Sequence, residues 1–235
     1  APLGPEGPAA KIGSGIGSYM SQKFRLSKND MVMYTTAGAG AAISAAFNAP
    51  IAGVFFGIEV ILLNDLKNRA LSALIISAVV ADILSRAYLG NDRIFNIPLY
   101  ETGDLNAYPF YFGLAIMCGI TALIYFRLSD RVRYLLNDKI KLHNPFLRLL
   151  PVTILFGFVL LRYEEIFGIG YSLINSVINR GMNYHDIVII LILKVVFLVL
   201  FIQAGAYGGT FAPSLSIGAL LGASFAITMN YIFRV

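Results

Sequence analysis

The chain has 235 residues, of which 57% are hydrophobic and 13% are charged, and its mean hydropathy is +0.73. This composition lies outside the range of soluble globular proteins and indicates an integral membrane protein. The net charge of +5 does not indicate nucleic-acid binding, because the basic residues are spread between apolar runs. The single cysteine, Cys118, excludes an internal disulfide framework and a cysteine metal site.

The chain opens on the stretch Gly-Pro-Glu-Gly-Pro at residues 4–8, which predicts the start of a helix over residues 7–24. Pro8 can occupy the first helical turn, where its missing N–H group costs nothing. Gly13 and Gly17 lie four residues apart and give this helix a face of small residues. Such a face allows the backbone of a neighbouring helix to approach closely.

Further helices are predicted along the rest of the chain, at residues 31–47, 50–60, 70–88, from 108 onward, 145–164, 171–179, 184–203 and from 210 onward. Five apolar runs are about long enough to cross or nearly cross a bilayer: residues 71–84, 108–125, 147–161, 187–202 and 214–232. Other apolar segments break at Gly, Pro or Asn, notably residues 48–63 and 168–178. Broken and unequal helices suggest a transporter or channel.

Basic residues gather between residues 127 and 148, which predicts a cytoplasmic segment by the positive-inside rule. Crossing parity then places the turn at residues 65–69 on the same side and the acidic loop at residues 92–104 on the other. Lys11 and Lys194 lie within or beside apolar segments. Each either extends to an interface or makes the local field favourable to anions.

A second glycine-rich turn, Gly-Gly-Thr-Phe-Ala-Pro at residues 208–213, repeats the pattern of the first. The repeated residues follow each proline at the same offsets: Ile12, Gly13 and Gly17 after Pro8, and Ile217, Gly218 and Gly222 after Pro213. Both copies predict helix N-termini, and two N-termini that converge would form an anion site without a basic side chain. The alternative is that these glycines only allow helices to pack closely.

Three stretches in order resemble the CLC chloride channels and chloride/proton exchangers. They are residues 4–8, Ala-Ala-Phe-Asn-Ala-Pro-Ile-Ala-Gly at 45–53 running on to Ile58-Glu59, and residues 208–213. The resemblance covers nearly the whole chain. It implies an all-α polytopic membrane protein with broken and short helices, built from two halves of opposite topology. It also implies a homodimer in which each subunit has its own pore.

Residues 1–88 would then be the latter part of the first inverted repeat, and residues 107–235 the first part of the second. A serine-bearing Gly-Ser-Gly-Ile-Pro motif and a pore tyrosine of the family are absent from these residues. We therefore expect a single transmembrane domain fragment that lacks both ends of the family domain. The expected location is a multi-pass position in the plasma (inner) membrane.

The resemblance also implies roles for individual residues. Glu6 corresponds to the family's gating glutamate, whose carboxylate occupies an anion position until it is protonated or moves. Thr210 and Phe211 correspond to the residues whose backbone amides bind the central chloride, with Gly7 and Ala212 nearby. Chloride is the expected ligand, and no cofactor or metal is expected. The family commonly has a basic residue at Pro5, so the outer anion site lacks one amide here.

A further difference concerns proton coupling. Exchangers of the family usually carry two glutamates at the end of the short helix, whereas this chain has Glu59-Val60. Valine cannot carry a proton, which favours a passive, voltage- or pH-gated chloride channel. The alternatives are a chloride/proton antiporter with a non-standard proton path, for which Glu59 is a possible substitute, and a non-conducting structural subunit. No nucleophile–base pair indicates an enzyme.

Overall fold

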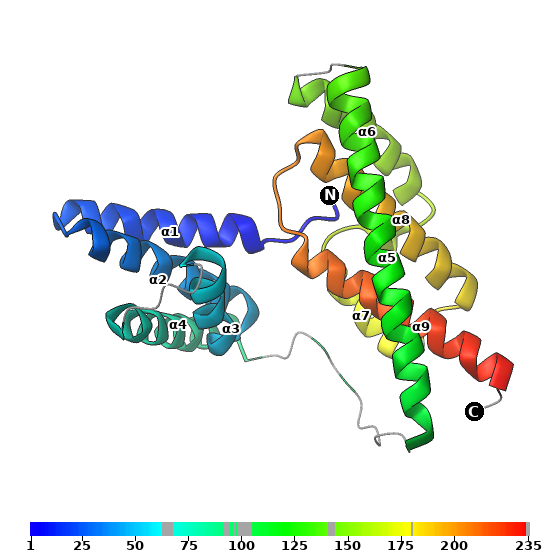
Figure 1. Ribbon diagram of the computed structural model, residues 1–235, viewed down its shortest axis with the longest axis horizontal. Helices are drawn as coiled ribbons and strands as arrows, with labels where there is room; N and C mark the ends of the chain where they lie inside the picture. Colours follow the sequence, from blue (N-terminus) through cyan, green and yellow to red (C-terminus); the bar gives the residue numbers. More distant parts are fainter. Residues whose placement is uncertain are drawn as a thin grey trace. The chain divides into compact units, whose positions relative to one another are not determined.

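The structure is a computed structural model that describes residues 1–62, 68–91, 95, 97, 105–140, 144–179 and 181–233 (Figure 1). The fold is all-α, as predicted, and it divides into two compact units. One unit comprises residues 5–94, and the other comprises residues 1–4 together with 95–235. The turn around Lys67 and most of the loop at 92–104, on which the predicted topology depends, lie outside the described residues.

The unit of residues 5–94 contains the helices α1 to α4. Their bounds are α1 Glu6–Lys23, α2 Lys28–Phe47, α3 Pro50–Phe56 and α4 Asn68–Leu89, and α3 continues into a π-helical turn, η1, at Gly57–Ile61. α2 is the central helix of this unit, because it packs against α1, α3 and α4 (Figure 1).

Glycines bring α1 and α2 together. A Cβ atom added to Gly13 would overlap the carbonyl oxygen of Gly38, and one added to Gly17 would overlap the carbonyl oxygen of Tyr34. The backbones of the two helices are therefore in direct contact along this face. The predicted close approach at the small-residue face of α1 is confirmed.

Serine hydroxyls connect α2 to α4. Ser44 Oγ donates to the carbonyl oxygen of Ala78 at 2.6 Å, and Ser85 Oγ donates to that of Ala45 at 2.9 Å. Hydrogen bonds of this kind are a common means of joining membrane helices, where the hydrophobic effect between helices is absent. They supplement the apolar contacts around Leu74 and Ala78.

The start of α2 differs from the prediction. The helix was expected over residues 31–47 but begins at Lys28, because the Ser27 side chain accepts a hydrogen bond from the Asp30 amide at 3.2 Å. A serine cap of this kind satisfies an amide that has no acceptor within the helix. The polar stretch between the first two helices is therefore shorter than the composition suggested.

A charged cluster joins α4 to the end of α2. Asp82 is buried, and one of its carboxylate oxygens accepts a hydrogen bond from Arg86 Nε at 2.8 Å. Arg86 Nη2 also donates to the carbonyl oxygen of Asn48 at 2.9 Å, where the left-handed backbone of Asn48 (φ 50°) ends α2. Arg86 thus balances a buried charge and caps a helix end.

Replacing Arg86 by methionine is expected to lower the free energy of unfolding by about 2–3 kcal/mol, since it leaves the Asp82 carboxylate buried without its cation. The expected loss is below that of a fully buried pair because the Arg86 side chain is 37% exposed. Thermal unfolding of the complete protein in detergent measures the effect. Arg86→Met/Asp82→Leu should recover most of the loss, and equal unfolding temperatures for Arg86→Met and wild type would contradict the assignment.

The second unit contains the helices α5 to α9. Their bounds are α5 Tyr108–Tyr134, α6 Pro145–Leu160, α7 Tyr171–Ile178, α8 Tyr184–Ala204 and α9 Phe211–Phe233. α8 packs against α5, α6 and α9, and α7 packs against α9. The core contains Phe156, whose ring meets those of Phe197 and Phe201 edge-on at centroid distances of 5.0 and 5.2 Å.

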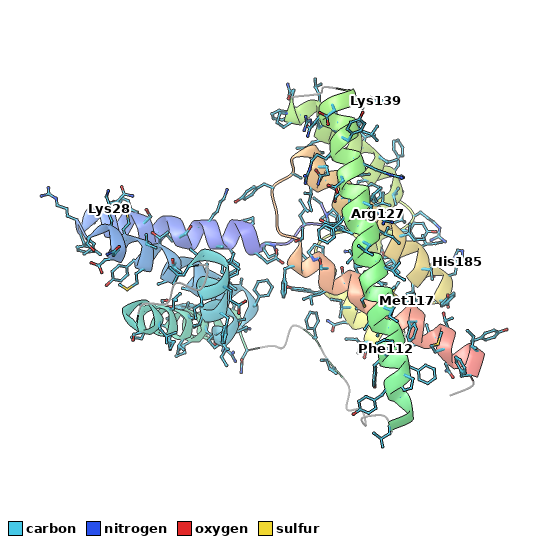
Figure 2. The ribbon with its side chains drawn as sticks, in the orientation of Figure 1. Lys28, Phe112, Met117, Arg127, Lys139 and His185 are labelled. Carbon is cyan, nitrogen blue, oxygen red and sulfur yellow. The ribbon has the colours of Figure 1, made fainter. Side chains whose placement is uncertain are left out.

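Four helices of the described residues are long and apolar enough to cross a membrane: 71–89, 108–139, 184–204 and 211–233. They correspond to four of the five predicted runs. The fifth run, at 147–161, lies in α6, which has 16 residues and ends at Leu160 rather than at Glu164. Figure 2 shows that α5 carries Phe112 and Met117 in its first half and Arg127 in its second, consistent with the predicted change from apolar to basic.

Candidate anion site

The two copies of the glycine-rich motif each begin a helix. α1 begins at Glu6 and α9 begins at Phe211, in both cases two residues before the motif proline. The first helical hydrogen bonds are also equivalent, from Ala9 N to Pro5 O at 2.8 Å and from Ser214 N to Thr210 O at 2.9 Å. The prediction that both motifs are helix N-termini is confirmed.

Gly4 and Gly209 pair with each other through their backbones. The Gly4 amide donates to Gly209 O at 2.8 Å, and the Gly209 amide donates to Gly4 O at 2.8 Å. Each glycine lies four residues before its motif proline, so the pair joins equivalent positions of the two copies. A reciprocal bridge between equivalent positions is the arrangement that a local two-fold axis produces.

Close packing at this bridge requires a glycine at position 208. A Cβ atom on Gly208 would lie 2.5 Å from Leu3 Cβ and 3.3 Å from Gly4 O. Thr210 comes one residue after Gly209, and Glu6 comes two residues after Gly4. The pairing was not predicted from sequence, although glycine at the same offset in both copies was the signal for it.

The predicted site residues differ in exposure. Glu6 and Ala212 are buried, Gly7 is half-buried, and Thr210 and Phe211 are exposed. The positive end of the helix dipole is at the start of each of the two helices, and Glu6 is the acidic residue in the first turn of α1. Each helix start can therefore attract an anion, and in α1 the protein's own carboxylate already lies there.

Thr210 also borders a cavity of about 530 Å³ between α5, α8 and α9. Its lining is mainly apolar, with Ser214 from α9 and Tyr125 from α5 among the polar residues.

In the second copy of the motif, the glycines equivalent to Gly13 and Gly17 are Gly218 and Gly222. A Cβ atom on either would meet no described atom within 4 Å, apart from its own helix and chain neighbours. The two copies thus have different surroundings.

The residues expected to bear on proton coupling lie in the π-helical turn η1, where Leu62 N donates to Gly57 O at 3.0 Å. Glu59 and Val60 are both exposed. π-helical turns are rare and often occur at functional sites. The turn was not predicted, because a π-helix differs from an α-helix in hydrogen bonding rather than in residue pattern.

The described residues contain no candidate metal site. His185 Nδ1 lies 3.9 Å from Asp186 Oδ1, and His143 lies outside the described residues. Within the part of the chain that the structure describes, no group of three His, Cys, Asp or Glu side chains is arranged to hold a metal ion.

The helices define this chain as a polytopic, all-α integral membrane protein. The chain belongs to the CLC family, since the family profile described as "Voltage gated chloride channel" matches residues 1–235. It is 31% identical over 242 residues to the H(+)/Cl(-) exchange transporter ClcA of Vibrio cholerae, covering 96% of this chain and 49% of the relative. The chain thus spans about half the length of the curated relatives it matches.

Two solved structures are also similar. One is a slow cyanobacterial Cl⁻/H⁺ antiporter, with a TM-score of 0.85 and 22% identity, covering 99% of this chain and 55% of that chain. The other is a CLC-type fluoride/proton antiporter, with a TM-score of 0.74 and 25% identity, covering 100% of this chain and 57% of that chain. The predicted family and fold class are confirmed.

Proposed function

We propose that this protein transports chloride across a membrane in exchange for protons, with Glu6 as the gate. The observation that carries the proposal is the reciprocal pairing of Gly4 with Gly209, which joins the two motif copies immediately before two helix starts. Helix starts provide backbone amides and positive potential, so chloride needs no basic side chain there. By correspondence with the family, Thr210, Phe211 and Ala212 at the start of α9 would bind chloride, and Gly7 is the corresponding residue at the start of α1.

The remaining features that we propose for this protein are those that the CLC resemblance implies. Residues 1–88 and 107–235 would belong to two inverted repeats. The complete protein would be a homodimer in the inner membrane, with the lipid bilayer and chloride as its partners. We propose neither a cofactor nor a nucleic-acid partner for it.

The choice between exchanger and channel depends on two opposing observations. Val60 cannot carry a proton and favours a channel, whereas the Vibrio cholerae relative is named as an exchange transporter. The solved structure of similar fold described above is likewise named as a fluoride/proton antiporter. We therefore favour exchange, with the exposed Glu59 carboxylate or ordered water supplying the proton path in place of Val60.

The test is proton movement in liposomes that contain the complete protein. An outward chloride gradient at clamped voltage is expected to drive proton uptake against the proton gradient, which a pH-sensitive dye inside the vesicles records. Chloride flux without proton movement would establish the channel instead, and absence of both would favour a structural subunit. Repeating the measurement with fluoride in place of chloride tests the choice of anion.

A further inference from the structure

Lys194 is a charged residue at the midpoint of a helix that is long and apolar enough to cross the membrane. It has ten residues of α8 on either side, in the span of highest mean hydropathy, 3.0. Each end of the helix is about 15 Å away, which is beyond the reach of a lysine side chain. The side chain is completely buried. Extension of Lys194 to the membrane interface is therefore excluded, and a charged residue in this position indicates a function.

Three segments of the same unit meet at the Lys194 ammonium group. Nζ donates to the carbonyl oxygen of Gly168 at 3.1 Å, in the segment before α7. A Cβ atom on Gly170 would lie 2.9 Å from Lys194 Nζ and 2.9 Å from Ser216 Oγ, so the ammonium group lies beside Ser216. Ser216 Oγ in turn donates to the carbonyl oxygen of Pro213 at 2.8 Å. The ammonium group thus lies beside the second turn of α9.

None of the ion pairs seen among the described residues, Arg86–Asp82, Arg133–Asp130 and His185–Asp186, includes Lys194. A positive charge without a paired carboxylate in a low-dielectric region acts over a long range. The start of α9 has the same sign of potential, because the helix dipole is positive at its N-terminus. The charge and the dipole therefore add at Thr210 and Phe211.

We propose that Lys194 is a positioning residue for the anion, which increases chloride affinity at the start of α9 without touching the ion. This inference rests on the proposed anion transport. Ser216 lies five residues into α9, so the charge is on the order of 10 Å from the first amides of the helix. At an effective dielectric constant of about 20, a unit charge at that separation changes anion affinity roughly tenfold.

The test compares chloride binding by calorimetry and the chloride dependence of flux for variants of the complete protein. Lys194→Met is expected to weaken chloride binding and raise the KM for chloride roughly tenfold, with little change in the rate at saturating chloride. Lys194→Arg, which keeps the charge, should stay within about twofold of wild type. Lys23→Met removes one exposed lysine from α1 and serves as the matched control for net charge.

Ser216→Asp provides a second variant in case Lys194→Met does not fold. It keeps the lysine but places a carboxylate beside it, so it should weaken chloride binding to a similar extent. A folded Lys194→Met or Ser216→Asp protein with wild-type chloride affinity would overturn the inference while leaving the proposed function intact. Absence of chloride binding and flux in the wild-type protein would instead overturn the proposed function itself.

Discussion

Glu6→Gln is expected to separate chloride movement from proton movement. In voltage-clamped liposomes that contain the complete variant, a chloride gradient should drive chloride flux but no proton uptake, and the flux should lose its pH dependence. The side chain keeps its shape but cannot take up or release a proton. A carboxylate at the start of α1 also competes with chloride for the positive end of the helix, whereas a neutral amide competes weakly. Chloride throughput should therefore rise.

The matched control is Glu164→Gln, which makes the same chemical change in the short turn after α6. This residue is exposed and lies outside both motifs, so coupling should stay at the wild-type level. A Glu6→Gln protein that still moved protons against their gradient would show that Glu6 is not the proton-carrying gate. Wild-type flux with wild-type pH dependence would likewise contradict its role.

The helix bounds could be predicted closely because the signals that set them are local. Pro8 and Pro213 each mark a helix start two residues earlier, and Asn48 with Pro50 marks the break between α2 and α3. One error arose where a single side chain decided the boundary. Ser27 extended α2 by three residues toward its N-terminus through its cap on Asp30, which hydrophobic pattern alone does not reveal.

The helix starts of the candidate site could be predicted, but the backbone contacts beside them could not. A glycine-rich turn before a proline distinguishes such a helix start in the sequence, whereas the roles of Glu6, Thr210 and their neighbours come from the family resemblance and stay predictions. The pairing of Gly4 with Gly209 was missed, since it joins residues about 200 positions apart. For Lys194 the sequence left two interpretations open, because the sequence alone does not show which helices cover its side chain. Burial of its side chain between α9 and the segment before α7 excludes extension to the interface.

Gly13→Ala is expected to lower the free energy of unfolding by about 3 kcal/mol, an unusually large effect for one methyl group. The added Cβ atom would overlap the Gly38 carbonyl oxygen and lie 2.8 Å from Ala42 Cβ on α2. Backbone atoms cannot move aside as the end of a flexible side chain can, so α1 and α2 must separate. Because α1 begins with Glu6, their separation should also disturb the proposed gate. Thermal unfolding in detergent and chloride flux in liposomes measure the two effects.

Gly15→Ala is the matched control, because it makes the same substitution two residues further along the same helix. A Cβ atom on Gly15 meets no described atom within 4 Å, apart from its own helix and chain neighbours. Alanine favours a helix over glycine by about 1 kcal/mol, and this gain applies equally to both positions. Gly15→Ala should therefore stabilise the protein slightly, and the difference between the two variants isolates the helix contact. If both variants unfolded at the same temperature, the glycines of α1 would not be required for close packing, and the contact between α1 and α2 would have to be reassigned.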